Sequence, residues 1–275
     1  MLHQGSPFSA DTEKQAKGRL FARSLLVRFC GSGTNTNMLH YEWLTWHYMR
    51  KSIIGARRYV TGSLLDIGSG SQPYKQFLES AVSSYVGLDR PSTQTMVPNA
   101  TAPDICGDVN SLPFRNESFD TILMTQVLEH VPDPQQALSE ASRILKQDGY
   151  LLLSVPFCEP LHGEPWDFFR YSQYGLGHLL DNAGLRIVLM EHQGYFGASI
   201  NKIVNRFLFR SPWKSTRFVR TVKLIGTPLL LLCVFFMNCL GIWLDKIAKF
   251  EEFTPNYFLV AEKVDLSTQE IPREG

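Results

Sequence analysis

The chain has 275 residues, 44% of them hydrophobic, and a formal net charge of +1. This length supports one large core, or a domain of ordinary size with attachments. The balanced charge argues against a nucleic-acid-binding protein and against an acidic tail. The five cysteines form no CxxC pair and no zinc spacing, so we expect free thiols in a reducing compartment. The first thirty residues carry charges throughout, which predicts no secretory signal.

A helix, a strand and a glycine turn are predicted first along the chain. Apolar residues recur every three or four positions over 39–60, which indicates a helix with one buried stripe. The apolar run 60–67 predicts a strand, followed by a turn at Gly68 and Gly70 and a helix that Pro73 opens. Such a turn presents backbone N–H groups to a nucleotide.

Strands and helices then alternate. Asp133 is the predicted N-cap of a helix that ends at Gly149, and Ser172 caps a second helix that ends at Gly184. The further predicted strands are 85–89, 104–108, 118–126, 150–157, 185–191 and 256–263. This alternation between 60 and 191 predicts an α/β fold with a parallel sheet.

The last third of the chain is basic and then apolar. Seven basic residues recur every three or four positions: Lys202, Arg206, Arg210, Lys214, Arg217, Arg220 and Lys223. The following run, 224–244, is uncharged and long enough for one membrane crossing. A crossing would prevent 256–263 from joining the sheet. We therefore predict an interfacial helix or shallow helical hairpin, bent at Pro228, on an anionic membrane surface; a solvated helix face is the alternative.

The glycine turn excludes two common nucleotide sites. A dinucleotide-binding turn needs a third glycine where this chain has Pro73, and Asp66 would repel a pyrophosphate. A P-loop needs Gly-Lys-Ser/Thr, which is not present in this turn. The turn favours a ligand that carries hydroxyls and a positive charge but no phosphate.

Five motifs in order carry a family resemblance: LLDIGSGSQPY, YVGLD, DICGDVNSLPFRNESFD, TQVLEHVPDPQQALSEASRILKQDGYLLLSVP and FFRYSQYGLGHLLDNAGL. With them, residues 60–191 resemble the class I S-adenosylmethionine-dependent methyltransferases, in the small-molecule branch of the ubiquinone and menaquinone methyltransferases. The resemblance implies a Rossmann-like, doubly wound, mostly parallel seven-stranded sheet. The expected parts are a helical extension (1–60), the core (61–199), a basic and apolar helical insertion (200–250) and the last strand with a polar tail (251–275).

The resemblance also implies a cofactor site for S-adenosyl-L-methionine at the carboxyl ends of the strands, where open α/β sheets bind ligands. Asp66, Gly68 and Gly70 would border the methionine part, and Asp89 would bind the ribose hydroxyls. Asp108 and the backbone at Val109 would meet the adenine, and Gln126 would lie near the amino-acid moiety. Each acid has the alternative role of an ordinary turn residue.

Methyl transfer to an oxygen also requires a base. The candidates are His162, His130 and Glu164. His162 is preferred, and His130 has the alternative role of ordering its loop. Ubiquinone-type enzymes bind a divalent metal with a similar stretch that has one more acid. This chain has Gln126 in the position of that acid, so we predict no metal.

The segment after the central strand is expected to contact the acceptor. Within it, Asp167 and Arg170 are expected to form an ion pair that braces the loop. The predicted function is methyl transfer to a small or lipid-linked acceptor, most plausibly at a hydroxyl, by a cytoplasmic protein attached peripherally or monotopically to the membrane. The alternatives are a soluble dimeric methyltransferase and a nucleoside-binding protein without turnover. Oligomeric state and acceptor identity stay open.

Overall fold

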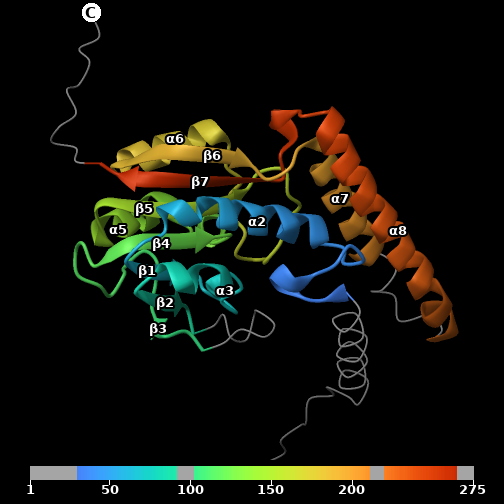
Figure 1. Cartoon of the computed structure of the whole chain (residues 1–275), viewed down its shortest axis with the longest axis horizontal. Helices are drawn as coiled ribbons and strands as arrows, with labels where there is room; N and C mark the ends of the chain where they lie inside the picture. The colour runs from blue at the N-terminus through green and yellow to red at the C-terminus, as the bar shows by residue number, and fades with distance from the viewer. Residues whose placement is uncertain (1–29, 92–101, 211–219, 265–275) are drawn as a thin grey trace, which may run out of the picture.

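The computed structural model describes residues 30–91, 102–210 and 220–264. Their seven strands form one sheet in the order β3-β2-β1-β4-β5-β7-β6 (Figure 1). The strands are β1 (Ser63–Ile67), β2 (Ser84–Asp89), β3 (Ile105–Cys106), β4 (Phe119–Thr125), β5 (Leu145–Pro156), β6 (Leu185–His192) and β7 (Asn256–Lys263). The predicted seven-stranded, Rossmann-like α/β sheet is confirmed.

The strand order reverses between β1 and β4, which pair in parallel at the middle of the sheet. Strands β1 to β5 run parallel to one another, whereas β7 lies antiparallel between β5 and β6. In doubly wound sheets the ligand lies outside the carboxyl ends of the strands at this reversal. The segments that follow β1 and β4 are therefore the place to look for a site.

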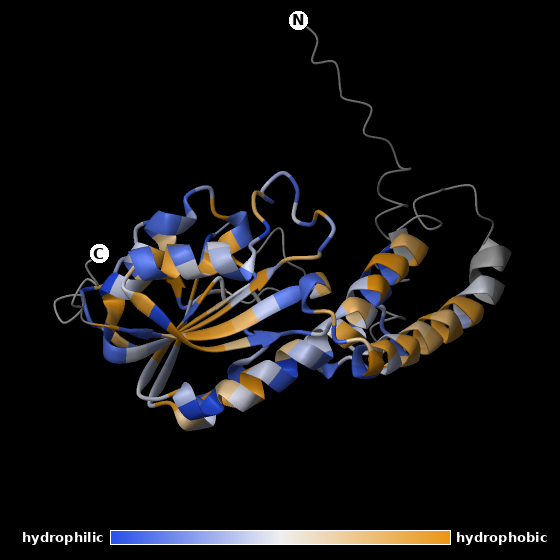
Figure 2. Cartoon of the chain, turned by 90° about the horizontal axis from the view of Figure 1, so that it is seen from above, coloured by the Kyte–Doolittle hydropathy of each residue, from blue (hydrophilic) through white to orange (hydrophobic). Residues whose placement is uncertain are grey.

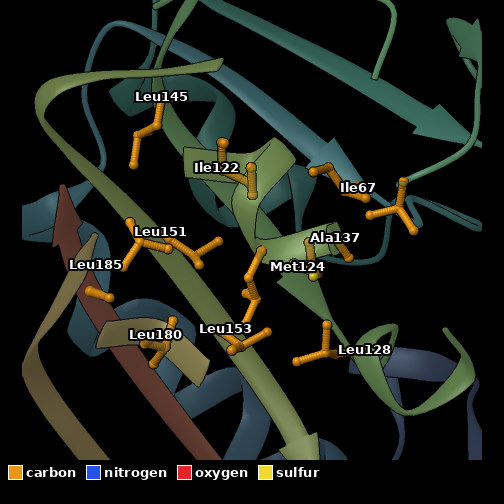
Figure 3. Packing of buried hydrophobic residues seen from close by; sticks show 14 of the residues in the cluster. Ile67, Ile122, Met124, Leu128, Ala137, Leu145, Leu151, Leu153, Leu180 and Leu185 are labelled. Carbon is orange, nitrogen blue, oxygen red and sulfur yellow. The ribbon is translucent and has the colours of Figure 1, made fainter. Parts of the chain in front are cut away.

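Two layers of helix cover the sheet. The helices α5 (Pro134–Ile144) and α6 (Gln173–Asn182) pack on one face, and α2 (Trp43–Gly55) and α3 (Lys75–Leu78) pack on the other. Because side chains alternate along a strand, Leu151 and Leu153 face α5 and α6, while Leu152 faces α2. Figure 3 shows the first of these cores. Short 3-10 turns add η1 (Gly33–Asn35), η2 (Ala56–Tyr59), η3 (Glu79–Ala81), η4 (Leu128–His130) and η5 (Glu251–Phe253).

The helix caps follow the sequence signals, but several helix ends do not. Asp133 and Ser172 accept hydrogen bonds from the backbone at their helix starts, as predicted. The helix α5 ends at Ile144 instead of Gly149, because Leu145 is extended and fully buried at the start of β5. Pro73 does not open a helix at its first position, since α3 begins at Lys75 and has a single turn.

The helices α7 (Phe196–Arg210) and α8 (Arg220–Ile247) form a helical hairpin between β6 and β7. They are antiparallel, since the Ala198 amide donates to Asp245 (3.1 Å) and the Asn201 side chain donates to Asn238 (3.0 Å). The helix α8 continues through Pro228. The hairpin lies beyond the end of the sheet at which the parallel strands finish (Figures 1 and 2). The chain then returns to the sheet as β7, as the sequence predicted.

Candidate active site

The turn after β1 is fixed by glycine geometry. Gly68 and Gly70 have φ angles of +69° and +50°, in the region that other L-residues rarely adopt. A Cβ atom on Gly68 would lie 2.3 Å from Cγ2 of Val127, so the turn packs directly against the segment after β4. The amides of Gly68 and Ser69 both donate to the Leu88 carbonyl (2.8 and 3.1 Å), so the turn is held at the reversal point between β2 and the segment after β4.

Asp89, at the end of β2, fastens this turn. Its Oδ2 accepts a hydrogen bond from the Gly70 amide (2.8 Å), and its Oδ1 accepts one from the Arg90 amide (2.7 Å). A carboxylate oxygen has two lone pairs and can accept more than one hydrogen bond. The ribose role predicted for Asp89 stays a prediction, next to this observed role in the turn.

Asp66 is buried near the end of β1. It alternates with Leu65 and Ile67 and so lies on the α2 side of the sheet, where the Tyr85 hydroxyl donates to its Oδ2 (2.6 Å). Burial raises the pKa of the Asp66 carboxyl to about 7, against the effect of the Tyr85 hydrogen bond, and the charge of Asp89 adds to the rise. The predicted proximity of Asp66 to the methionine part remains untested.

The adenine candidates follow β3. Asp108 is exposed, accepts a hydrogen bond from the Asn110 amide (2.9 Å) and pairs with Arg90 at 3.4 Å. Val109 next to it is buried. A polar side chain and a buried apolar one stand together at this strand end, which suits the edge and face of a base.

Gln126 follows β4 in a strained conformation. Its φ is +54°, its amide donates to the Ser154 carbonyl (2.9 Å), and its side chain donates to the Ser154 hydroxyl (3.0 Å). Non-glycine residues in the left-handed region are concentrated at functional sites. Gln126 therefore ties the ends of β4 and β5 together at the reversal point.

Residues 157–171, here called the acceptor loop, follow β5. Arg170 donates to both carboxylate oxygens of Asp167 (2.6 and 2.8 Å), and this interaction lowers the pKa of Asp167 to about 2. The expected ion pair is present. The loop is fastened to η4 by the Phe168 amide, which donates to the Glu129 carbonyl (2.9 Å). The base candidate Glu164 is exposed on the loop.

The acceptor loop brings three side chains together, here called the Glu–His–His cluster: Glu129, His130 and His162. The Glu129 Oε1 atom lies 3.6 Å from Nε2 of His162 and 3.9 Å from Nε2 of His130. Burial acts to lower the pKa of His162, but the carboxylates of Glu129, Glu159 and Asp167 outweigh it and raise that pKa. Both predicted acid–base histidines thus share one carboxylate.

Sequence reasoning gave Glu129 no role in the site. The sequence could have predicted that these residues lie close together. His130 and its neighbour Glu129 follow β4, His162 follows β5, and these two strands are adjacent. Carboxyl ends of adjacent parallel strands meet at one edge of the sheet.

Two of the seven basic residues do not face a membrane. Lys202 and Arg206 on α7 pair with Glu159 of the acceptor loop, and Arg206 also donates to the Leu161 carbonyl (3.1 Å). The expectation that both meet lipid headgroups is wrong, because their charged groups point into the fold and pair with the buried Glu159. The described side chains do not include those of the other five.

The helix α8 has a polar inner face and an apolar outer face. Asn238 and Asp245 are buried against α2, α7 and the segment before α2. The outer stripe consists of exposed side chains at helical spacing: Leu229, Leu232, Phe236, Leu240, Trp243 and Ile247. Among the described residues, only the segment Gly226–Ile247 has the length and composition to cross a membrane. In Figure 2 many residues along this helix have the colour of hydrophobic residues.

Comparisons with known proteins agree with this geometry. A family model described as a methyltransferase domain matches residues 65–153, from β1 to β5. Residues 65–153 are a methyltransferase domain. The demethylmenaquinone methyltransferase of Renibacterium salmoninarum is 30% identical to this chain over 131 residues, which are 46% of this chain and 53% of that protein. The chain spans between about a third and a half of the length of the first curated relatives it matches.

Two solved structures share the fold of the methyltransferase domain. The protein in complex with the Haloferax volcanii Trm112 methyltransferase activator has a TM-score of 0.52 and 19% identity, over 82% of this chain and 92% of that one. The [4+2]-cyclase SpnF has a TM-score of 0.51 and 18% identity, over 79% and 80%. A cyclase on this fold is a reminder that the fold alone does not give the reaction.

The residues around the glycine turn fit S-adenosylmethionine, the cofactor that the family resemblance implies. The buried Ser69 hydroxyl oxygen in the glycine turn has no hydrogen-bond partner among the described residues, which leaves it for a ligand. Gly68 and Gly70 flank it, and Asp89 next to the turn supplies a carboxylate. Together they match a ligand with hydroxyls and a cationic end.

Proposed function

We propose that this chain transfers the methyl group of S-adenosylmethionine to a hydroxyl of a lipid-linked acceptor at a membrane surface. The observation that carries the proposal is the distribution of polar and apolar residues on α8. Polar Asn238 and Asp245 are buried, and the apolar outer stripe is exposed. Exposed apolar patches of this kind are typical of interaction surfaces. An interfacial helix buries such a face among lipid acyl chains.

The position of the hairpin supports this choice of acceptor. The hairpin lies at the carboxyl end of the parallel strands, beside the acceptor loop (Figure 1). Lys202 and Arg206 join it to Glu159, three residues before His162. The acceptor loop itself exposes Leu161, Trp166 and Phe168. A lipophilic acceptor held in a membrane would meet this loop without leaving the apolar phase.

In the reaction, bound S-adenosylmethionine supplies an electrophilic methyl carbon on a sulfonium. The chain's own residues have three tasks. The glycine turn and Asp89 would hold and orient the cofactor. The Glu–His–His cluster would receive the acceptor hydroxyl and its proton, with His162 as the predicted base. The acceptor loop would exclude water from the reacting atoms.

The proposal predicts both cofactor binding and membrane binding by the purified chain. Isothermal titration with S-adenosylmethionine, followed by a search for S-adenosylhomocysteine as product, tests catalysis against a nucleoside-binding role. Flotation with anionic vesicles tests the membrane role. A soluble dimer would float poorly and would change its size in detergent, because its apolar stripe would be covered by a second copy.

Attachment to the cytoplasmic face, without a crossing, is part of the same proposal. The strand β7 follows α8 and pairs with β5 along its length. A crossing by α8 would separate these two strands. Labelling of a cysteine placed after Gly275 in intact vesicles is expected to find it on the same side as the N-terminus, and the opposite side would contradict the proposal.

A further inference from the structure

The Glu–His–His cluster is made by two separate segments. Glu129 and His130 belong to η4, after β4, and His162 belongs to the acceptor loop, after β5. One ligand atom from each residue lies within 4.8 Å of the other two. The two imidazole rings meet edge to face, with centroids 5.0 Å apart. Gly163 allows this approach, since a Cβ atom there would lie 2.9 Å from His130 Cε1.

The carboxylate of Glu129 has no lysine or arginine partner among the described residues, and only the two histidines lie near it. Its side chain is fully buried, and neither carboxylate oxygen accepts a hydrogen bond within the described residues. The other two acids near His162 differ, because Glu159 pairs with Lys202 and Asp167 pairs with Arg170. An ionised carboxylate without hydrogen bonds is strongly destabilising inside a protein. Glu129 therefore calls for a cation next to it.

The Nε2 atoms of both imidazoles lie on the side of Glu129. The Nδ1 atom of His130 lies 2.5 Å from the Trp166 carbonyl oxygen, which accepts the Nδ1 proton and leaves Nε2 without one. Around Nδ1 of His162 lie one donor, Arg170 (3.4 Å), and three acceptors: the Pro160 carbonyl (3.4 Å), Glu159 (3.8 Å) and Asp167 (3.8 Å). A carbonyl that orients the far nitrogen of a histidine is typical of metal ligands.

We propose that Glu129, His130 and His162 bind one divalent transition-metal ion. Two imidazoles and a carboxylate suit a first-row ion such as Zn²⁺ or Mn²⁺ better than Mg²⁺ or Ca²⁺, which prefer oxygen ligands. Metal–ligand bonds of about 2.1 Å place two ligand atoms at most about 4.2 Å apart, so a small movement of the side chains completes the site. Three protein ligands leave open positions on the ion.

This site differs from the expectation drawn from the sequence. No metal was predicted because Gln126 occupies the position of an acid, and the Gln126 side chain indeed turns to Ser154. The third ligand comes instead from the acceptor loop. An ion here makes both histidines ligands in place of a general base. It lowers the pKa of a hydroxyl at an open position, and the released proton leaves to water. Only this last step rests on the proposed function.

The test is metal binding by the full chain after treatment with a chelator, without cofactor or acceptor. Titration calorimetry with Zn²⁺ and with Mn²⁺ is expected to give one site per chain. Co²⁺ is expected to give a visible absorption band from nitrogen ligands. Glu129→Gln and His162→Gln are each expected to weaken binding by at least about tenfold. The matched control, His178→Gln on the exposed face of α6, leaves binding unchanged.

Three outcomes are informative. If the folded wild-type chain binds neither ion with one-to-one stoichiometry, the proposal is overturned. Glu129 and His162 would then form an ion pair that involves a proton and no metal. Equal binding by wild type and Glu129→Gln, with unchanged circular dichroism, also overturns it. Metal binding without any methyl transfer supports this site and counts against the proposed function alone.

Discussion

The Nζ atom of Lys202 in α7 donates a hydrogen bond to Glu159, the third residue after β5. Both side chains are nearly buried, with 9% and 6% of their surfaces exposed. The pair joins the helical hairpin to the acceptor loop, and His162 follows Glu159 by three residues. The part of the chain with the most apolar surface is thereby fixed to the part that carries the Glu–His–His cluster.

Replacing Lys202 by methionine is expected to destabilise the protein. The substitution nearly keeps the length of the side chain but leaves Glu159 with the more distant Arg206 (3.5 Å) and His162 (3.8 Å). Loss of one partner of a buried pair lowers the free energy of unfolding by about 3–5 kcal/mol. The decrease should be near the lower value, because Arg206 still neutralises part of the Glu159 charge. Urea denaturation measures it. The exposed Lys249→Met is the control, with a change within about 0.5 kcal/mol; equal effects of the two substitutions would show that the pair does not hold the hairpin.

The buried Asp66 predicts a specific pH dependence of stability. Its pKa rises from 3.8 to about 7 on folding, so the folded state binds the proton more tightly than the unfolded state does. The associated stability is complete below about pH 4 and is lost as the pH rises to about 7, by up to about 4 kcal/mol. Asp66→Asn keeps an oxygen for Tyr85 and removes the titration. Denaturation should show that the free energy of unfolding of Asp66→Asn increases relative to that of the wild type between pH 4 and 8. The control, Asp181→Asn on α6, should show no such relative increase. Parallel curves for wild type and Asp66→Asn would contradict the assignment.

Asp89→Ala is expected to weaken the binding of S-adenosylmethionine by about 1.5–3 kcal/mol, the range for a hydrogen bond to a charged group. The same substitution frees the Gly70 amide, so thermal unfolding must be measured alongside. Calorimetric titration gives the affinity, and exposed Asp181→Ala serves as the control. A folded Asp89→Ala protein with wild-type affinity would remove Asp89 from the cofactor site.

Membrane binding should depend on the outer stripe of α8. Phe236 and Trp243 are 61% and 56% exposed, so their replacement by serine disturbs no core. Because each large apolar side chain contributes about 1.5–3 kcal/mol when buried, the double variant should bind anionic vesicles at least about tenfold more weakly. Tyr174→Ser is the matched control, an aromatic side chain 80% exposed on α6. Complete release of the wild type by high salt would contradict apolar insertion.

The sheet was predictable from sequence because its strands are short apolar runs bounded by turns. Because β5 is buried on both faces, it is apolar along most of its length. Such a run can be recognised in the sequence without knowledge of the neighbouring elements. Helix ends were less predictable. The end of α5 at Ile144 depends on Leu145 reaching the core, and glycine spacing in the sequence does not contain that information.

The candidate site was predictable where it follows strand ends, and not where it depends on pairing across the fold. Spacing alone gave Lys202 and Arg206 the same environment as the rest of the basic series. Their side chains point toward Glu159, which lies more than forty residues earlier in the sequence. The same holds for Glu129, whose partners come from a loop that only the sheet brings near.

Transfer of a labelled methyl group tests the central claim most directly. Membrane and aqueous fractions of a cell extract are each incubated with the purified chain and S-adenosylmethionine labelled in its methyl group, at a concentration that does not saturate the wild type. The control is Asp89→Ala, which is expected to bind the cofactor more weakly. The account predicts label in the lipid-extractable part of the membrane fraction with wild type, and little with Asp89→Ala. Label confined to water-soluble molecules, or no label in either fraction, would contradict methylation of a lipid-linked acceptor.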